Sequence, residues 1–137
     1  MGDLVKRDDI YYKKFTETPF TGKVTGKAQG SYKNGKKEGE WVSHDDNGQL
    51  SGKGNFKNGK RDGEWVYYHD GQLWSKGSYK NGKKKDEWVK YHGNGQLNNK
   101  GSYKNGEKGG DWVWYHDNGQ LEEKGSWKNG VMEGETV

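Results

Sequence analysis

Three histidines recur at equivalent positions in the sequence. His69, His92 and His116 each end a short aromatic run, and an aspartate follows two of them. Such a row could hold a metal ion or act in acid–base catalysis. In a sheet of repeated hairpins, equivalent residues lie two strands or roughly 10 Å apart, whereas zinc ligands lie about 2 Å from one ion. We therefore expect no metal site, no cofactor and no catalytic residue, and we interpret the chain as non-enzymatic.

Lysine and arginine form the second group, because they gather around one kind of turn. The recurring phrase K-N-G-K-K places them beside Asn-Gly pairs, whereas histidine and aspartate mark the alternate turns. In an antiparallel meander alternate turns lie on opposite edges, so one edge becomes basic although the formal net charge is only +4. This edge is either a solvated surface that resists aggregation or an anion-binding site. The candidate anion-binding residues are Lys36, Lys37, Lys60, Arg61, Lys83, Lys84 and Lys85.

Side chains that differ between otherwise similar copies form the third group. The position two after a recurring tryptophan differs in every copy, and so does the position after a recurring leucine. A scaffold does not require a particular residue at such positions, and Tyr and Trp are frequent at interface hot spots. We expect Tyr67 to lie nearly opposite Trp74 on one face; the alternative is that these aromatics extend the core. The candidate partner-binding residues are Tyr67, Trp74, Lys90 and Trp114.

All of these residues belong to a 24-residue unit that occurs four times and is one residue shorter in its second copy. Each copy approximates G-S-Y-K-N-G-K-K-x-G-E-W-V-x-Y-H-D-N-G-Q-L-x-x-K. A fixed period of this kind indicates a stacked repeat architecture. The predicted division is an N-terminal capping half repeat at 1–29, repeats at 30–53, 54–76, 77–100 and 101–124, and a C-terminal half repeat at 125–137.

Turn and strand signals within the unit predict an all-β chain. Asn-Gly and Asp-Gly supply the positive φ angles of tight hairpins, and a strand lies between successive turns. We predict about 11 strands in one elongated, single-layer antiparallel meander with essentially no helix. Hydrophobic residues make up only 26% of the chain and mean hydropathy is −1.47, which leaves little apolar surface for a thick two-layer core.

Regularly spaced aromatics nevertheless provide a core, because 14% of the residues are aromatic and they keep register with the repeat. One copy buries too few apolar side chains to offset the entropy of ordering, so the copies must stack. The glycine that opens each copy is expected to leave room for a tryptophan ring over the neighbouring strand, with a flexible kink as the alternative. The predicted core residues are Trp41, Trp65, Trp88, Trp112, Leu50, Leu73, Leu97 and Leu121.

The amino-acid sequence of the repeat resembles that of a known family. Residues 63–65 (G-E-W), 117–121 (D-N-G-Q-L) and 124–127 (K-G-S-W) resemble the MORN repeat variant found in the YwqK family of bacterial proteins, often labelled antitoxins. Residues 12–15 and 19–23 are similar to that family's opening half repeat, so the resemblance covers about residues 10 to 137. It implies an elongated, twisted antiparallel sheet, no catalytic residues and an antitoxin or immunity-like partner.

These observations favour a non-enzymatic repeat scaffold for protein–protein interaction. The alternative is an envelope-associated binder of anionic lipid or glycan, through the lysine-rich edge or the aromatic stripe; a purely structural spacer is held in reserve. We expect no specific nucleic-acid partner. The final half copy stops at Glu135-Thr136-Val137, so we expect an uncovered strand around Gly125–Lys128 that permits self-association.

Compartment is left open by the sequence. The chain contains no cysteine, so neither a disulfide framework nor a thiolate metal site is expected. No apolar run approaches the roughly 20 residues of a membrane span, and the first ten residues are too charged for a signal peptide. Both a cytoplasmic protein and an exported mature form fit these observations.

Overall fold

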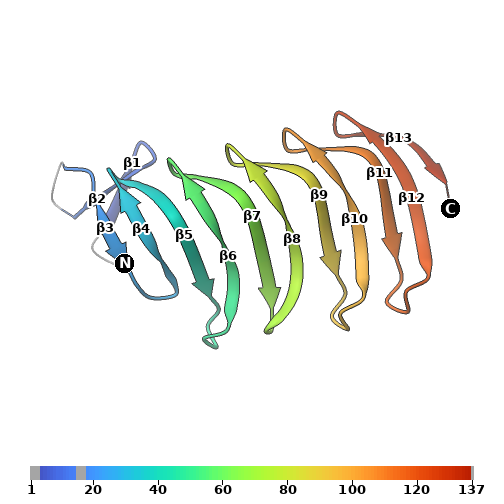
Figure 1. The fold of residues 1–137 in the computed structure, drawn as a ribbon, viewed down its shortest axis with the longest axis horizontal. Helices are drawn as coiled ribbons and strands as arrows, with labels where there is room; N and C mark the ends of the chain where they lie inside the picture. The colour runs from blue at the N-terminus through green and yellow to red at the C-terminus, as the bar shows by residue number, and fades with distance from the viewer. Residues whose placement is uncertain (1–3, 15–17, 137) are drawn as a thin grey trace.

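A computed structural model describes residues 4–14 and 18–136 and shows one long antiparallel meander (Figure 1). Eleven strands form a continuous sheet in the order β13 to β3, and a separate two-stranded ribbon, β1–β2, lies at its N-terminal end. No helix occurs in the described residues, so the all-β prediction is confirmed. Phe15 of the predicted cap and Val137 of the final half copy lie outside the described residues. The strands are β1 (Leu4–Arg7), β2 (Ile10–Lys13), β3 (Gly22–Val24), β4 (Ala28–Lys33), β5 (Lys36–His44), β6 (Leu50–Lys57), β7 (Lys60–His69), β8 (Gln72–Lys80), β9 (Lys83–Tyr91), β10 (Leu97–Lys104), β11 (Glu107–Tyr115), β12 (Leu121–Lys128) and β13 (Val131–Thr136).

Two kinds of turn alternate and lie at opposite long edges of the sheet (Figure 1). Two-residue Asn-Gly turns connect β4 to β5, β6 to β7, β8 to β9, β10 to β11 and β12 to β13. In the turn at Asn58-Gly59 the φ angles are 52° and 82°, both positive as a type I′ hairpin turn requires. The histidine-containing turns occupy the other edge, so the predicted separation of the two turn types is confirmed.

The core is a single layer of rings on one face of the sheet. Trp41, Trp65, Trp88 and Trp112 are only 3–5% exposed. Each indole covers the glycine that opens its repeat: a Cβ placed on Gly54 would lie 2.1 Å from Cδ2 of Trp65. The Trp65 Nε1–H donates to the Asn55 carbonyl at 2.9 Å, and the other three tryptophans repeat this bond. The prediction that glycine makes room for the ring is therefore confirmed for Gly54, Gly77 and Gly101.

A second row of rings, at the position of Tyr79, fills the spaces between these tryptophans. Tyr79 meets Trp65 and Trp88 edge-on, with ring centroids 6.3 and 5.1 Å apart. Edge-to-face contacts of this kind contribute about 0.5–1.5 kcal/mol each beyond the area they bury. The same pattern runs from Tyr32 to Trp112, so neighbouring repeats stabilise one another through their rings.

The leucines predicted for the core do not belong to this layer. Leu50, Leu73 and Leu97 are half-buried, and Leu121 is 45% exposed. Each leucine pairs with the last residues before a histidine-containing turn, as Leu121 does with Tyr115. At that edge a single-layer sheet has no second layer to cover an apolar side chain. The prediction of four core leucines is therefore wrong, most clearly for Leu121.

The two ends of the sheet are closed in different ways. At the N-terminal end, Tyr11 of β2 and Phe20 pack on Tyr32, with ring centroids 5.0 and 5.7 Å apart. At the other end, β12 pairs with both β11 and β13, so the expectation of an uncovered strand at Gly125–Lys128 is wrong. The final half copy is long enough to form a complete hairpin, and it moves the outer edge to β13.

Candidate binding face

The positions that vary between repeats form one continuous row across the sheet. Strand pairing places Tyr67 opposite Ser75, Ser75 opposite Lys90, and Lys90 opposite Asn99. Side chains two residues apart on a strand share a face, so this row lies on the same face as the core tryptophans. We call it the variable row; its members are Ser43, Gly52, Tyr67, Ser75, Lys90, Asn99, Trp114 and Glu123.

A β-bulge brings the second set of variable positions to the same face. Each bulge lies in the strand that follows a histidine-containing turn, where that strand has one extra residue. It lies opposite the residues that come two and three positions after the recurring tryptophan of the preceding strand. The Ser43 and Ser51 hydroxyls lie 2.9 Å apart, and the Lys90 Nζ lies 5.0 Å from the centre of the Trp74 ring. The structure thus gathers on one face two sets that the sequence could not orient. The extra residues are Ser51, Trp74, Asn98 and Glu122.

Tyr67 is not an exposed anchor, and this part of the prediction is wrong. Its ring is stacked against Trp65 and Trp88, with interplanar angles of 23° and 26°. Its hydroxyl lies 3.0 Å from that of Tyr79, and burial together with this hydrogen bond raises the pKa of Tyr67. Because the bulge adds Trp74 to β8, Tyr67 pairs with Ser75 and not with Trp74.

The other three candidates remain accessible to different degrees. Trp74 is 46% exposed and lies under the Lys90 amine. Trp114 is half-buried: its ring centre lies 6.0 Å from that of Trp112, and the Lys108 amine lies 5.6 Å from it. The accessible aromatic of the predicted set is therefore Trp74, with Lys90 beside it.

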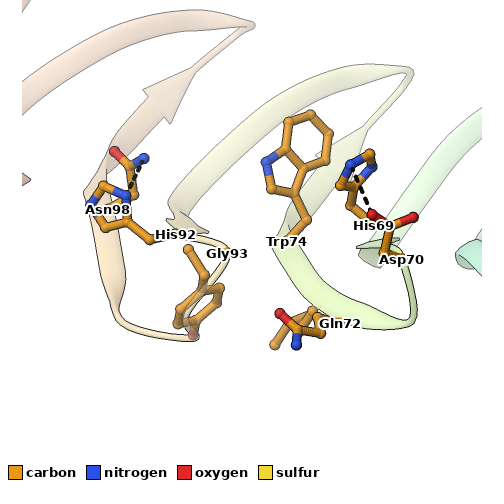
Figure 2. A pocket seen from close by; sticks show the side chains of 9 residues that line it. His69, Asp70, Gln72, Trp74, His92, Gly93 and Asn98 are labelled. Carbon is orange, nitrogen blue, oxygen red and sulfur yellow. Dashed lines mark hydrogen bonds and ion pairs between the residues drawn. The ribbon is translucent and has the colours of Figure 1, made fainter. Parts of the chain in front are cut away.

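A cleft of about 510 Å³ opens beside Trp74, at the edge of the histidine-containing turns. Figure 2 shows Trp74 standing between the His69–Asp70 pair and the His92–Asn98 pair. The His92 Nε2–H donates to the Tyr115 carbonyl at 2.8 Å, which leaves Nδ1 to face the Asn98 amide at 3.4 Å. The cleft occurs where the second copy is one residue short, so the irregularity of the repeat and the exposed tryptophan coincide.

The histidines themselves do not converge. His92 is fixed by the backbone of the next repeat, whereas His69 and His116 make separate contacts with Asp70 and Glu122 at 3.6 Å each. Among the residues that the structure describes, no group of three or more His, Cys, Asp or Glu side chains could hold a metal ion.

The candidate anion-binding residues follow Asn-Gly turns and lie at one edge, as predicted, but they divide between the two faces of the sheet there. Three turn back over the core rings: Lys37, Arg61 and Lys84 lie 4.7, 5.0 and 4.6 Å from the centres of the Trp41, Trp65 and Trp88 rings. Burial lowers the pKa of Lys37 and of Lys84, and nearby positive charges lower both further. The separation follows from the pleat, since consecutive residues of a strand point to opposite faces.

The remaining cations lie on the opposite face beside the Asn-Gly turns. Lys36, Lys60 and Lys83 are exposed, and each lies near the glycine of the next turn. Lys85 is half-buried and lies 3.9 Å from Asp86. Together with neighbouring lysines, Lys36, Lys60 and Lys83 form an exposed basic strip, which we call the lysine strip and to which Lys85 does not belong. Its members are Lys33, Lys36, Lys57, Lys60, Lys80, Lys83, Lys104 and Lys128.

The ring layer should be visible in an alkaline titration. Burial raises the pKa of Tyr32 to about 12, and burial also raises the pKa of Tyr103. An unfolded tyrosine ionises near pH 10, so the stability that Tyr32 provides is complete below about pH 10 and is lost as the pH rises through about 12. We expect the ultraviolet absorbance of tyrosinate to show a step near pH 12 that is absent from Tyr32→Phe. Identical curves for the two proteins would contradict this assignment.

Comparison with known proteins agrees with this architecture. A family model described as "MORN repeat variant" matches residues 37–58, 61–81, 87–105 and 108–129, and each match begins within one copy of the repeat and ends in the next. No curated protein matches the sequence significantly. The solved structure titled "Crystal structure of GtfA/B complex bound to UDP and GlcNAc" is similar over 87% of this chain, at 14% identity. This chain spans 22% of that protein, and the TM-score is 0.27.

The structure also bears on membrane crossing. Within the described residues there is no helix long and apolar enough to span a bilayer.

Proposed function

Because the chain belongs to the MORN repeat variant family, we propose that it is a non-enzymatic scaffold that binds another protein through its aromatic face. MORN repeats generally mediate binding to proteins or to membrane lipids. An antitoxin or immunity-like role is the finer form of this proposal, and it rests on the resemblance to the YwqK family alone.

One observation supports the choice of face. The side chains that differ from repeat to repeat lie on the face of the core tryptophans, and one of them, Lys90, lies over the exposed ring of Trp74. A repeat scaffold needs its glycines, turns and core rings in every copy, but it needs no particular residue at these positions. Large exposed rings beside a cleft are typical anchors for a partner.

Trp74→Ala is expected to weaken partner binding about 30-fold or more while lowering the free energy of unfolding by less than about 1 kcal/mol. The reason is that the ring is half exposed and contributes little to the core. Wild type and variant are used to capture partners from native lysate, and the dissociation constant is then measured with the purified partner. Leu121→Ala is the matched control, because Leu121 is 45% exposed and belongs to the fourth repeat.

Equal retention of the partner by Trp74→Ala and wild type contradicts this proposal. A second candidate function is favoured by the lysine strip, whose exposed amines on the opposite face could contact an anionic lipid surface. Binding to vesicles that contain phosphatidylserine, with a steep loss on addition of salt and no effect of Trp74→Ala, would support that alternative instead. Glycan binding through the aromatic stripe would be sensitive to Trp74→Ala but would need no protein partner.

A further inference from the structure

Tyr67 occupies a ring-sized space between two core tryptophans. Its ring centre lies 6.0 Å from that of Trp65 and 6.4 Å from that of Trp88, with both neighbours stacked nearly parallel to it. The next space along the sheet lies between Trp88 and Trp112, and Lys90 stands there at the position equivalent to Tyr67. Of the three spaces between successive core tryptophans, the first has Ser43 at this position, the second is filled by Tyr67, and in the third a lysine replaces the tyrosine.

The two spaces have the same frame. In the filled space, Tyr79 contacts Trp65 and Trp88 at 6.3 and 5.1 Å, with interplanar angles of 85° and 83°. In the second space, Tyr103 contacts Trp88 and Trp112 at 6.3 and 5.2 Å, with interplanar angles of 81° and 89°. Tyr79 and Tyr103 contact their flanking tryptophans at nearly the same distances and angles, so the two pairs of tryptophans are held in equivalent positions. A planar ring that fits the first space should therefore also fit the second.

Lys90 does not fill the second space, because its amine is directed over Trp74 at 5.0 Å. A cleft of about 140 Å³ remains, and Trp88, Trp112 and Trp114 line it together with Tyr103. A cavity of about 150 Å³ is large enough to bind benzene. The cleft therefore has room for one six-membered ring, and we call it the ring slot.

The ring slot is surrounded by positive charge. Lys84, Lys90 and Lys108 all line it, and its lining contains no aspartate or glutamate. The Lys84 and Lys108 amines lie 4.6 and 5.0 Å from the centres of the Trp88 and Trp112 rings. Burial lowers the pKa of Lys84, and the positive charges of Lys90 and Lys108 lower it further, which is the direction expected where an anion would be favourable.

We propose that the ring slot receives one aromatic side chain from an acidic segment of a partner protein. The ring lies between Trp88 and Trp112 as Tyr67 lies between Trp65 and Trp88, and flanking carboxylates pair with Lys84, Lys90 and Lys108. This inference rests on the proposed function, because it identifies which partner chemistry the aromatic face recognises. A tyrosine side chain is favoured over a nucleotide because the equivalent occupant is a tyrosine and the volume holds a single ring.

The test uses the full chain and three short peptides. The probe is acetyl-Glu-Glu-Tyr-Glu-Glu-amide; one comparison peptide has leucine in place of tyrosine, and the other has lysines in place of the glutamates. Binding is followed through the indole N–H signals of Trp88 and Trp112 in NMR titrations. We expect the probe to bind about tenfold more tightly than either comparison peptide and to shift these two signals first.

Lys90→Tyr is the decisive variant, because it places in the slot the residue that fills the preceding space. It is expected to fold at least as stably as wild type and to weaken binding of the probe about tenfold. Lys76→Tyr is the matched control: it makes the same substitution at an exposed residue whose strand partner is Val89, on the opposite face. Lys90→Glu, compared with Lys76→Glu, leaves the slot open and reverses one charge, and it should also weaken binding of the acidic probe.

Several outcomes would overturn the ring slot. These are equal binding of the tyrosine and leucine peptides, unchanged binding by both Lys90 variants, or displacement of the two indole signals by adenosine monophosphate but not by the probe. The captured partner separates this failure from failure of the proposed function. If Trp74→Ala disrupts the complex and Lys90→Tyr does not, the aromatic face stands and the slot is wrong; if neither variant affects the complex, the proposed face is wrong as well.

Discussion

Replacing Trp88 with alanine is expected to lower the free energy of unfolding by about 3–5 kcal/mol. The ring is 4% exposed, it packs between Tyr79 and Tyr103, and its Nε1–H donates to the Ser78 carbonyl at 3.0 Å. The substitution removes these contacts and leaves a cavity that the adjoining rings cannot close, since each is fixed by its own repeat. Total stability of a domain is about 5–15 kcal/mol, so the loss should be large enough to affect folding at ambient temperature.

Urea denaturation followed by circular dichroism measures this loss, and Trp74→Ala is the matched control. Both substitutions remove an indole from the same face, but Trp74 is 46% exposed and should cost less than about 1 kcal/mol. Equal losses in the two variants would show that burial on this face does not distinguish core from binding residues. Trp74 would then be withdrawn as an anchor.

Gly77→Ala is expected to destabilise the protein by about 1–3 kcal/mol, although it adds only a methyl group. A Cβ at this position would lie 2.1 Å from Cδ2 of Trp88, which is a steric clash. The clash is relieved only if the indole moves away from β8. Gly109→Ala is the control, because Gly109 also lies within a strand but a Cβ there meets no atom within 4 Å. Its effect should stay within about 0.5 kcal/mol.

The double variant Gly77→Ala/Trp88→Ala tests the cause directly. Once the indole is gone, the three closest contacts of the methyl group at position 77 are removed, so the combined loss should be smaller than the sum of the two single losses. Strict additivity in urea denaturation would falsify the assignment of this glycine to ring clearance. The flexible-kink explanation would then be preferred.

The local features of the fold were predictable because each is specified by a few neighbouring residues. Asn58-Gly59 and its equivalents adopt positive φ angles regardless of their surroundings, so the hairpins and the alternating edges could be derived from the sequence. The pairing of Gly54 with Trp65 could also be predicted, because a missing side chain at a fixed distance from a large ring recurs in every copy.

Other features depended on register and could not be derived locally. A single extra residue in β8 changes which side chain faces Tyr67, and a bulge of this kind leaves no clear mark in the sequence. For this reason Tyr67 was expected to be exposed opposite Trp74, whereas it is stacked between two core tryptophans. A leucine recurs at the position of Leu121 in every repeat, which predicts a core residue. Leu121 is nevertheless exposed, because the single layer of rings does not cover the edge of the histidine-containing turns.

The sequence by itself determined the repeat, its hairpins and its aromatic core, since these follow from backbone preferences and from a period that any copy displays. Only the tertiary structure decided what the variable residues do, because their surroundings are contributed by other strands. Tyr67 and Lys90 occupy the same position in the repeat. Tyr67 fills a space between two tryptophans, whereas Lys90 turns toward Trp74 and leaves its space open. The difference arises from packing between repeats, which no single repeat contains.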